Sequence, residues 1–429
     1  MDGDRTIRVS DLSRVEGEGG LHVRVRDGRV ESVRLDIFEP PRYFEALLRG
    51  RTYLEPVDIT ARICGICPVA YQLTAAQAIE AACGVVVDGP LRELRRLLYC
   101  GEWLQSHALH VYLLHAPDFL GYDGAVEMAR DHPDLVRRGL RLKKAGNRLM
   151  EVVGGRAVHP INPRVGGFHR APERGELAAL IDSLEEARED ALATLRWAAG
   201  LDFPDLEVDA ELVALGPPHE YPIDRGRIRS TGGLDLAPAE FGDHFSESQV
   251  AHSSALVSAL HGRTYLVGPL ARYSLNADRL LPDVRAAATE AGLGPECRNP
   301  FRSILVRGAE MLQACVEALT IVRGYRPPDR PYVPVEPHAG EGSACTEAPR
   351  GLLYHRYRLD AQGRILAATI VPPTSQNQLA IEADLRRLVE HGLDLPDGEL
   401  AHLCERGVRN HDPCISCAAH FLRLDVQRV

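Results

Sequence analysis

The 429-residue sequence predicts a mainly helical α+β fold, in which long helices form a bundle and small β-sheets lie at its periphery. Three observations lead to this prediction. Several long segments repeat apolar residues every three or four positions, which is typical of helices. Two short segments, one near each end of the chain, alternate apolar and polar residues around turn sequences, which is typical of β-hairpins. Loops that contain glycine and cysteine lie between these segments, and we expect the functional residues there.

The helical segments are placed by their apolar spacing and by the residues that end them. The first is expected at 43–51 and ends at Gly50. The others are expected from the pair Cys64 and Cys67 to about 83, at 91–115, at 173–199, at 301–323 and at 380–391. Within 91–115, His107 and His110 are three residues apart and share one face of the helix. No carboxylate or cysteine accompanies them in the sequence, so we interpret both as buried core histidines and not as metal ligands.

Two β-hairpins are expected, one near each end. The first pairs 21–25 with 30–35 around Asp27-Gly28, and the second pairs 352–359 with 364–371. The segment 205–235 is rich in proline and glycine and predicts irregular surface structure. Because the two cysteine motifs lie at opposite ends of the chain, we expect residues 1–420 to form one interwoven domain.

The composition is that of an ordinary globular protein, with 45% hydrophobic residues, 26% charged residues and a formal net charge of −10. Mild acidity without a basic block argues against nucleic acid as a partner. No window of about 18 apolar residues is present, so we expect no membrane span. The first residues are charged and no apolar segment follows them, so we expect no signal peptide and a cytoplasmic location.

The ten cysteines are of two kinds. Six are scattered singly and are interpreted as small buried hydrophobic residues, namely Cys83, Cys100, Cys297, Cys315, Cys345 and Cys404. The other four form two C-x-x-C pairs, Cys64 with Cys67 and Cys414 with Cys417. One such pair could be a redox dithiol or half of a zinc site. Two pairs supply four soft thiolates, which select zinc, an iron–sulfur cluster or a late transition metal such as nickel.

The spacing of the pairs favours a functional transition-metal site over structural zinc. Structural zinc pairs usually lie about 15–20 residues apart in a small domain, and the ligands of an iron–sulfur cluster are usually spaced more closely. Zinc also gives no reason for the polar residues that accompany the cysteines, namely Glu16, Glu45, Arg350, Asp412 and His420. On spacing alone, a zinc protein with four thiolate ligands remains the alternative.

The residues around the cysteines resemble a known family. R-x-C-G-x-C from Arg62 and D-P-C-x-x-C-x-x-H from Asp412 are similar to the two signatures of the [NiFe]-hydrogenase large subunit. Three further blocks match that family in the same order, R-V-E-G from Arg14, G-G followed by H-P from Gly154, and E-A-P-R-G from Glu347. The resemblance covers the whole chain, and the I-C-P-V-A and Q-S-H-A-L-H segments are most like the soluble, multi-subunit, nicotinamide-linked enzymes.

The resemblance implies a fold and a metal centre. The fold would be the long-helix bundle of that subunit, with the metals near its middle. Nickel would be held by all four thiolates, with Cys64 and Cys414 as terminal ligands and Cys67 and Cys417 bridging to an iron. That iron would carry cyanide and carbon monoxide ligands, which maturation proteins supply and this chain does not encode.

The resemblance also implies roles for residues that are not ligands of the two metals. Two groups are candidate bases for the proton released from H₂, the thiolate of Cys414 and the guanidine of Arg350, whose role could instead be electrostatic. Asp412 would orient Arg350 by a charge-assisted hydrogen bond. Glu16 would relay protons away from Cys414, and Thr374 would hydrogen-bond an iron cyanide.

A magnesium site and two departures complete the comparison with the family. Glu45, His420 and the backbone carbonyl of Ile370 match ligands of a magnesium ion beneath the metal centre. Tyr71 stands where many relatives have a histidine, and a phenol does not titrate near neutral pH. Ser106 stands where many relatives have an aspartate that helps to hold the arginine, so one charged partner is missing.

The implied reaction is the reversible oxidation of H₂ to two protons and two electrons. The chain has no remaining cysteine cluster to carry electrons, so we expect it to bind an iron–sulfur small subunit and also flavin- and nicotinamide-binding reductase subunits. A hydrogen sensor with the same centre, acting through a signalling partner, is one alternative. A non-catalytic scaffold, like the related quinone-reductase subunit, is another, but it predicts lost cysteines and all four are present.

Residues 421–429 form a tail after the last motif, and two interpretations of it stay open. In the family, a segment after the final histidine is commonly removed once nickel is inserted. Here Leu422, Leu424 and Val426 alternate with polar residues, which instead indicates a retained strand.

Overall fold

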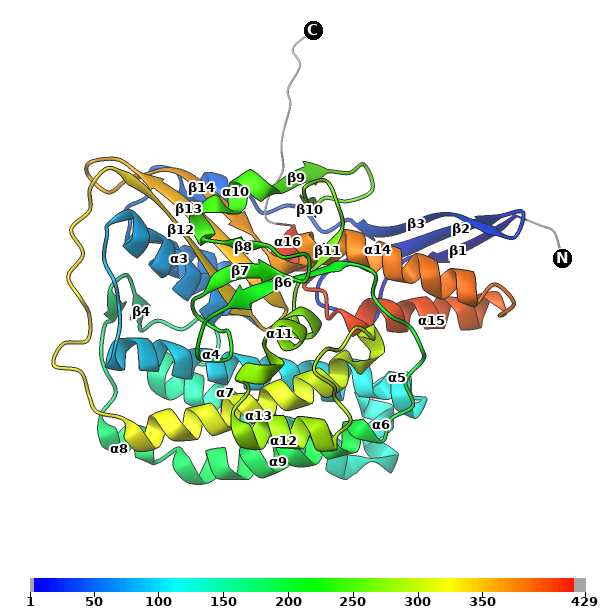
Figure 1. The fold of residues 1–429 in the computed structure, drawn as a ribbon, viewed down its shortest axis with the longest axis horizontal. Coiled ribbons are helices and arrows are strands. Elements are labelled where there is room, and N and C mark those ends of the chain that lie inside the picture. Colours follow the sequence, from blue (N-terminus) through cyan, green and yellow to red (C-terminus); the bar gives the residue numbers. More distant parts are fainter. Residues whose placement is uncertain (1–3, 420–429) are drawn as a thin grey trace, which may run out of the picture.

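The computed structural model describes residues 4–419, and it has a helical layer on one side and several small sheets on the other (Figure 1). The helical layer is built by four long helices, α4 (Pro90–Leu109), α7 (Pro133–Gly154), α9 (Ile181–Ala199) and α13 (Ser303–Gly324). α4 packs against both α7 and α13, and α13 packs against α9. α4 continues into a π-helical turn at His110–His115.

Glycines at the contact between α4 and α7 allow the two helices to lie close together. A β-carbon on Gly146 would lie 2.5 Å from the carbonyl oxygen of Gly101, closer than side-chain carbons are found. An alanine at either position would therefore push the helices apart. Close backbone packing of this kind fixes the position of α4, whose side chains Glu102 and Gln105 bond backbone groups beside the first cysteine pair.

The other α-helices within residues 4–419 range from four to 19 residues in length. They are α1 (Phe44–Leu48), α2 (Pro56–Thr60), α3 (Pro68–Ala82), α5 (Ala116–Leu120), α6 (Ala125–Asp131), α8 (Arg174–Ala178), α10 (Phe241–His244), α11 (Pro269–Asn276), α12 (Pro282–Glu290), α14 (Pro373–His391), α15 (Asp397–Asn410) and α16 (Ile415–Ala418).

Within residues 4–419, the strands form five small sheets. Two are three-stranded and antiparallel, one of β1 (Arg5–Val9), β2 (Gly19–Arg26) and β3 (Arg29–Ile37), the other of β12 (Gly340–Ala348), β13 (Gly351–Leu359) and β14 (Ile365–Val371). A four-stranded sheet has the order β11 (Tyr265–Leu266), β6 (Glu211–Gly216), β7 (Arg227–Ser230) and β8 (Asp235–Leu236). The two remaining sheets pair β9 (Phe245–Gln249) with β10 (Leu256–Leu260) and β4 (Pro163–Arg164) with β5 (Gly167–Phe168).

The sequence-based fold class is confirmed, with helices in the bundle and small sheets around it. Both predicted hairpins are present as β2–β3 and β13–β14, and each gains a third strand that the sequence did not reveal. The six single cysteines are all buried, as predicted. The side chains of His107 and His110 are also buried.

Several predicted boundaries were wrong. The segment 205–235 is not irregular surface, because β6 is almost wholly buried and pairs with β7 and β11. The helix predicted at 173–199 is interrupted between α8 and α9. The helix predicted at 380–391 begins at Pro373 and is not the last one before the second cysteine motif, since α15 follows it. For β6, strand pairing outweighed the local signal of proline and glycine.

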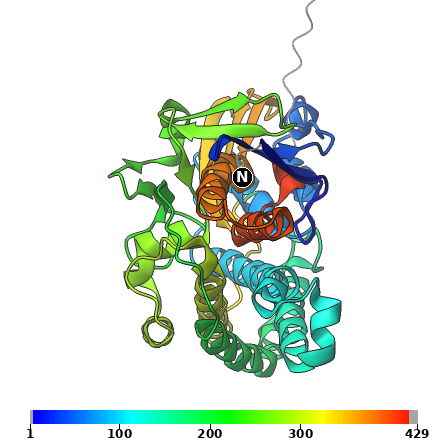
Figure 2. The same ribbon diagram turned by 90° about the vertical axis from the view of Figure 1, so that its right-hand side faces the viewer.

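The two ends of the chain meet in the interior. Figure 2 looks onto the N-terminal sheet with α14 and α15 beside it, and α14 packs against β3 and α15. Glu16, on the loop between β1 and β2, forms an isolated parallel β-bridge with Cys414. α3 lies against β12 and β13, where a β-carbon on Gly342 would come within 2.2 Å of Ala78 O. This packing brings Cys64 and Cys67, at the start of α3, close to Cys414 and Cys417, at the start of and within α16.

Candidate metal centre

Four cysteine thiols converge at the point where the two chain ends meet. The Sγ atoms of Cys64 and Cys414 are 3.5 Å apart, and those of Cys67 and Cys417 are 3.7 Å apart. All four Sγ atoms lie within 4.8 Å of one another, and all four residues are buried. A set of four soft donors in this arrangement suits a late transition metal, to which cysteine binds as the thiolate.

The N-terminal pair is shaped by the start of α3. Cys67 precedes the first turn of α3, and the N–H groups of Ile66 and Cys67 both donate to the Cys64 Sγ at 3.3 Å. The buried carboxylate of Glu102 accepts from the N–H groups of Val69 (2.6 Å) and Ala70 (3.1 Å) in that first turn. A carboxylate at this position satisfies the unpaired N–H groups of a helix start, so Glu102 fixes the helix that presents Cys67.

Glu16 lies directly against the C-terminal pair. The Cys414 thiol donates to Glu16 Oε2 at 3.0 Å, and the backbone N–H of Ser416 donates to the same oxygen at 3.1 Å. The backbone carbonyl of Glu16 accepts from the N–H of Ile415 at 2.9 Å. Glu16 is only partly buried, so its carboxyl joins the buried thiol to a less enclosed region.

Arg350 and Asp412 form a buried pair beside the thiols. Arg350 Nη2 lies 3.1 Å from Asp412 Oδ1, and Arg350 Nε donates to the backbone carbonyl of Asp412 at 2.8 Å. Asp412 adopts a left-handed backbone conformation with φ of 50°, which turns the chain into Cys414. Although burial opposes it, the pKa of Arg350 is raised above its usual value by the carboxylate of Asp412 and the neighbouring thiols, so the guanidinium stays charged.

Thr374 and Glu45 each accept a hydrogen bond from a backbone N–H group. Thr374, in the first turn of α14, accepts from the backbone N–H of Cys414 through Oγ1 at 3.0 Å. Glu45 accepts from the backbone N–H of Ile370 at 2.7 Å and is almost fully buried. Because the N–H and C=O of a strand residue point the same way, the Ile370 carbonyl also faces Glu45. His420, the third expected magnesium ligand, lies outside the described residues.

The two departures from the family pattern, Tyr71 and Ser106, are both buried. The hydroxyl of Tyr71 has no hydrogen-bond partner among residues 4–419, and burial raises the pKa of the phenol well above its usual value. The hydroxyl of Ser106 is likewise buried and unpartnered within that range. Neither side chain carries a charge, so the negative charge of Asp412 is the one that pairs directly with Arg350.

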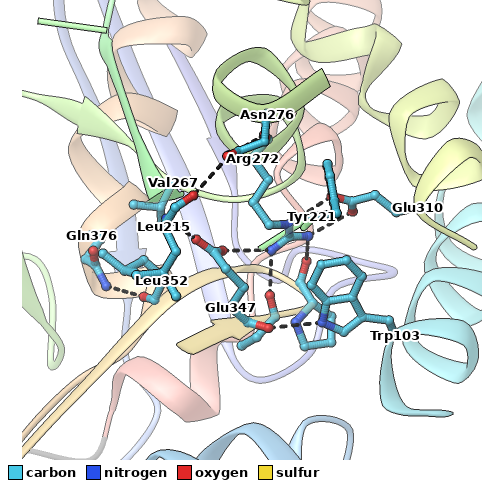
Figure 3. A network of polar contacts seen from close by, with 12 residues as sticks. Trp103, Leu215, Tyr221, Val267, Arg272, Asn276, Glu310, Glu347, Leu352 and Gln376 are labelled. Atoms are coloured by element: carbon cyan, nitrogen blue, oxygen red, sulfur yellow. Dashed lines mark hydrogen bonds and ion pairs between the residues drawn. The ribbon is translucent and has the colours of Figure 1, made fainter. Parts of the chain in front are cut away.

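Sequence reasoning missed the network that holds Arg350 from behind (Figure 3). Arg272, on α11, is completely buried and uses all five of its N–H groups. Its guanidinium bonds both carboxylate oxygens of Glu310 at 2.8 Å and one oxygen of Glu347 at 3.2 Å. It also donates to the backbone carbonyls of Ala348 (2.6 Å) and Pro349 (2.8 Å), the two residues just before Arg350.

Trp103 completes this network. The Arg272 guanidinium lies 4.4 Å from the centre of the Trp103 ring, and the indole N–H donates to the backbone carbonyl of Glu347 at 3.0 Å. Glu310 also contacts His107, whose Nε2 lies 2.9 Å from Glu310 Oε2. This carboxylate comes from α13, far from His107 in sequence, which explains why the sequence offered no partner for the histidine. Arg272 is thus a positioning residue for the loop that carries Arg350.

Burial gives Glu347 a testable pH signature. Burial of the carboxyl raises the pKa of Glu347 from 4.5 to about 7, against the opposing charge of Arg272. Below about pH 4.5 the group is protonated in the folded and the unfolded chain. Between pH 4.5 and about 7 the folded chain binds more protons, so stability falls as pH rises, by about 3 kcal/mol in all. We expect urea unfolding of Glu347→Gln to lack this fall, while a control on the same strand, Glu341→Gln, keeps it.

The residues fit a nickel–iron group. Four buried thiols supply the donor set, and two polar atoms next to them, Arg350 Nη1 and Asp412 Oδ2, are buried without a hydrogen-bond partner among residues 4–419. A buried, unpartnered guanidinium N–H is suited to an anionic diatomic ligand such as cyanide. With Glu16 on Cys414, the arrangement can bind metal, hold a fixed positive charge over it and pass a proton outward.

Fold and site together define a protein with a buried four-cysteine metal site. Comparison with known proteins identifies its family. The family model described as "Nickel-dependent hydrogenase" matches residues 42–133. Sulfhydrogenase 1 subunit alpha of Pyrococcus furiosus is 34% identical, over 97% of this chain and 98% of that protein. NAD-reducing hydrogenase HoxS subunit beta of Cupriavidus necator is 28% identical, over 97% of this chain and 95% of that one.

Solved structures agree with the sequence comparison. A crystal structure of an NAD⁺-reducing [NiFe]-hydrogenase in the H₂-reduced state superposes with a TM-score of 0.86 at 27% identity, covering 97% of this chain and 99% of that one. The chain belongs to the [NiFe]-hydrogenase large-subunit family. It is a catalytic subunit of the hydrogenase class, and its cysteine cluster is the nickel–iron site. Within residues 4–419, no helix is long and apolar enough to cross a membrane.

Proposed function

We propose that this chain catalyses the reversible oxidation of H₂ to two protons and two electrons, and that its electrons leave through an iron–sulfur small subunit towards NAD⁺ or NADP⁺. The observation that carries the proposal is the convergence of four buried thiols with a carboxyl that accepts directly from one of them. Cys64, Cys67, Cys414 and Cys417 would hold nickel, and Cys67 and Cys417 would share iron bearing cyanide and carbon monoxide. When bound, this group supplies the Lewis acidity that polarises H₂.

The proton leaves the site through Cys414 and Glu16. The thiolate of Cys414 is the base that takes the proton. Once protonated, the thiol can donate to Glu16 Oε2, which lies 3.0 Å from its Sγ. Glu16 then passes the proton outward, since it is the less buried member of the pair. The Ser416 N–H, which donates to the same oxygen, keeps the carboxyl pointed at the thiol.

Arg350 acts through its charge and not as a base. Arginine remains protonated at physiological pH, and the Asp412 carboxylate beside it favours the charged form further. A fixed cation beside four thiolates stabilises negative charge in the site and excludes alternative positions for anionic ligands. Thr374, whose Oγ1 accepts from the Cys414 N–H, has its hydroxyl hydrogen left to donate to an iron cyanide.

The role of Glu16 is tested by Glu16→Gln. We expect H₂ oxidation to fall by about 10²- to 10⁴-fold, the usual contribution of a positioned proton-transfer group, because an amide cannot carry the proton onward. The metal centre should stay assembled, with unchanged nickel content. The control is Glu18→Gln, an exposed carboxylate two residues away, which should retain full activity. Equal activity of both variants would remove Glu16 from the proton route.

The electron partner is supported by the composition of the site and by the surface near it. The six cysteines outside the site are buried and are scattered through the chain, so they do not form a ligand set for an iron–sulfur cluster. Another subunit must therefore supply the clusters that carry electrons. Apolar side chains are exposed on the segments that flank the first cysteine motif, which suits a covered interface. These residues are Phe38, Tyr43, Leu47, Leu54, Val158 and Ile161.

The nicotinamide link rests on relatives. One protein of 28% identity is named for NAD reduction, and a 27% identical structure is of an NAD⁺-reducing enzyme. The 34% identical relative is instead named a sulfhydrogenase, so acceptor choice must be measured. We expect the purified complex to reduce NAD⁺ or NADP⁺ with H₂. A complex that reduces an artificial dye but neither nucleotide would contradict the nicotinamide link and leave the hydrogenase activity intact.

A magnesium ion bound by Glu45, the Ile370 carbonyl and His420 is part of the same proposal. Its support is the buried carboxylate of Glu45 on α1, which accepts from the N–H of Ile370 on the edge strand β14, since Mg²⁺ prefers oxygen ligands. Metal analysis of the purified complex should find about one magnesium ion per chain, and Glu45→Gln should lower that occupancy. Full occupancy in this variant would exclude Glu45 as a ligand.

We also propose that residues 1–420 act as one interwoven domain. The isolated β-bridge between Glu16 and Cys414 supports this proposal.

His420 and residues 421–429 lie outside the described residues. The mass of the mature chain would show whether residues 421–429 are removed or retained. The sensor alternative predicts the same metal content with negligible turnover. Measurement of H₂ turnover therefore distinguishes a catalytic subunit from a hydrogen sensor.

A further inference from the structure

The segment before α1 crosses the C-terminal cysteine motif and bonds to it through Arg42. The backbone N–H of Arg42 donates to the carbonyl of Ala419 at 3.0 Å. Its guanidinium Nη2 donates to the carbonyl of Ile63 at 2.8 Å and to that of Ser416. Ile63 precedes Cys64, and Ser416 precedes Cys417. One side chain therefore ties the backbones of the two cysteine motifs together.

Glu39 makes the second connection in the same segment. Its Oε2 accepts from the hydroxyl of Ser416 at 2.8 Å and from the backbone N–H of Glu18 at 3.3 Å. The Glu39 backbone carbonyl accepts from the hydroxyl of Ser254 at 2.8 Å. Ser416 is thus held on both sides, its carbonyl by Arg42 and its hydroxyl by Glu39. We call Glu39 and Arg42 the clasp.

The surrounding residues are suited to keep the clasp closed. Gly17 has φ of 90°, and a β-carbon there would lie 2.5 Å from Glu39 Oε2 and 2.9 Å from Ser416 N, so only glycine lets these segments approach. The Arg42 guanidinium lies 5.5 Å from the centre of the Phe44 ring. Tyr43 between them is in the left-handed region, with φ of 53°, and turns the chain from the clasp into α1.

The C-terminal motif needs outside support. α16 has only four residues, far too few for a helix to be stable by itself. Its backbone must therefore be positioned by contacts from other segments. The planar fork of arginine can bond two carbonyls on different segments at once, which the point charge of a lysine does less well.

We propose that Glu39 and Arg42 are positioning residues that hold the C-terminal thiols in register with the N-terminal thiols. The inference rests on the proposed function only in taking these thiols as the metal ligands. The protection of the backbone amides at 414–419 can be measured whether or not metal is bound.

Hydrogen–deuterium exchange of the purified complex tests the clasp. In Arg42→Gln and in Glu39→Gln, we expect amides at 414–419 to exchange at least about tenfold faster, the change produced by the loss of one hydrogen bond to a charged group. Peptides from α9 should be unchanged. The control is Arg49→Gln, an exposed arginine of the same region whose side chain makes no hydrogen bond or ion pair with residues 4–419.

A spectroscopic measurement on the same samples separates positioning from general stability. Displaced thiols should shift or broaden the infrared band of iron-bound carbon monoxide in Arg42→Gln, and Arg42→Lys should restore it only in part. Exchange and infrared bands equal to those of Arg49→Gln would overturn the proposal. If the unsubstituted complex lacks the bands, the proposed function fails, whereas the exchange comparison still decides the clasp. If Arg42→Gln does not fold, Arg42→Lys and Glu39→Gln give the same decision.

Discussion

Replacing Cys67 with alanine is expected to abolish H₂ turnover and to remove the metal centre. Cys67 lies at the start of α3, within 3.7 Å of Cys417, and would be shared by both metals. Loss of a member of a catalytic unit commonly costs about a thousandfold or more in rate. Here the loss should approach the detection limit, because metal binding itself depends on the residue. Nickel and iron analysis with H₂-dependent dye reduction measures both effects.

The matched control for this variant is Cys315→Ala, which removes a thiol that is equally buried but lies on α13, outside the cluster. It should cost some stability through a small cavity and leave nickel content and turnover close to normal. Nickel retained at full level in Cys67→Ala would show that this thiol does not bind metal. Equal losses in both variants would point to folding and not to the site.

The second large effect is expected for Arg350→Lys. Lysine keeps the positive charge but cannot reproduce the two N–H contacts that Arg350 makes with the carbonyl and the carboxylate of Asp412. Because the charge is then misplaced by an ångström or more, we expect turnover to fall by about 10²-fold or more. Nickel content should be nearly normal, which distinguishes this variant from loss of a ligand.

A conservative change on β13, the strand that follows Arg350, serves as the control. Arg358→Lys, at an exposed position of β13, should have normal turnover. The harsher variant Arg350→Ala should also destabilise the chain, by about 3–5 kcal/mol, since it leaves the Asp412 carboxylate buried without its partner. Normal turnover in Arg350→Lys would contradict this prediction. It would mean that any positive charge in this region is sufficient and that its exact position is not required.

The fold class and the two hairpins could be predicted because apolar periodicity is local and strong in those segments. β6 could not, because its residues lie within proline- and glycine-rich sequence and become a strand through pairing with β7 and β11. β12 was likewise missed, although its pairing with β13 places Glu347 and the loop to Arg350. Strand pairing is a long-range choice that a single segment does not encode.

The candidate site divides in the same way. Paired cysteines and short motifs made the metal ligands and Arg350 visible in the sequence. Arg272 and Glu102 were not visible, because each acts through backbone groups of distant segments, Arg272 on residues 348–349 and Glu102 on 69–70. Arginine and glutamate are common residues in helices, so their presence there does not indicate a contact with a distant backbone group. Their complete burial in the structure is the signal that identifies them.

Infrared spectroscopy of the purified, matured complex, combined with metal analysis, tests the central claim most directly. We predict bands from iron-bound cyanide and carbon monoxide, with about one nickel per chain, because four thiolates and the Arg350 guanidinium are suited to that group. Zinc in place of nickel, or no metal, together with the absence of these bands, would contradict the assignment of the cysteine cluster as a working nickel–iron centre.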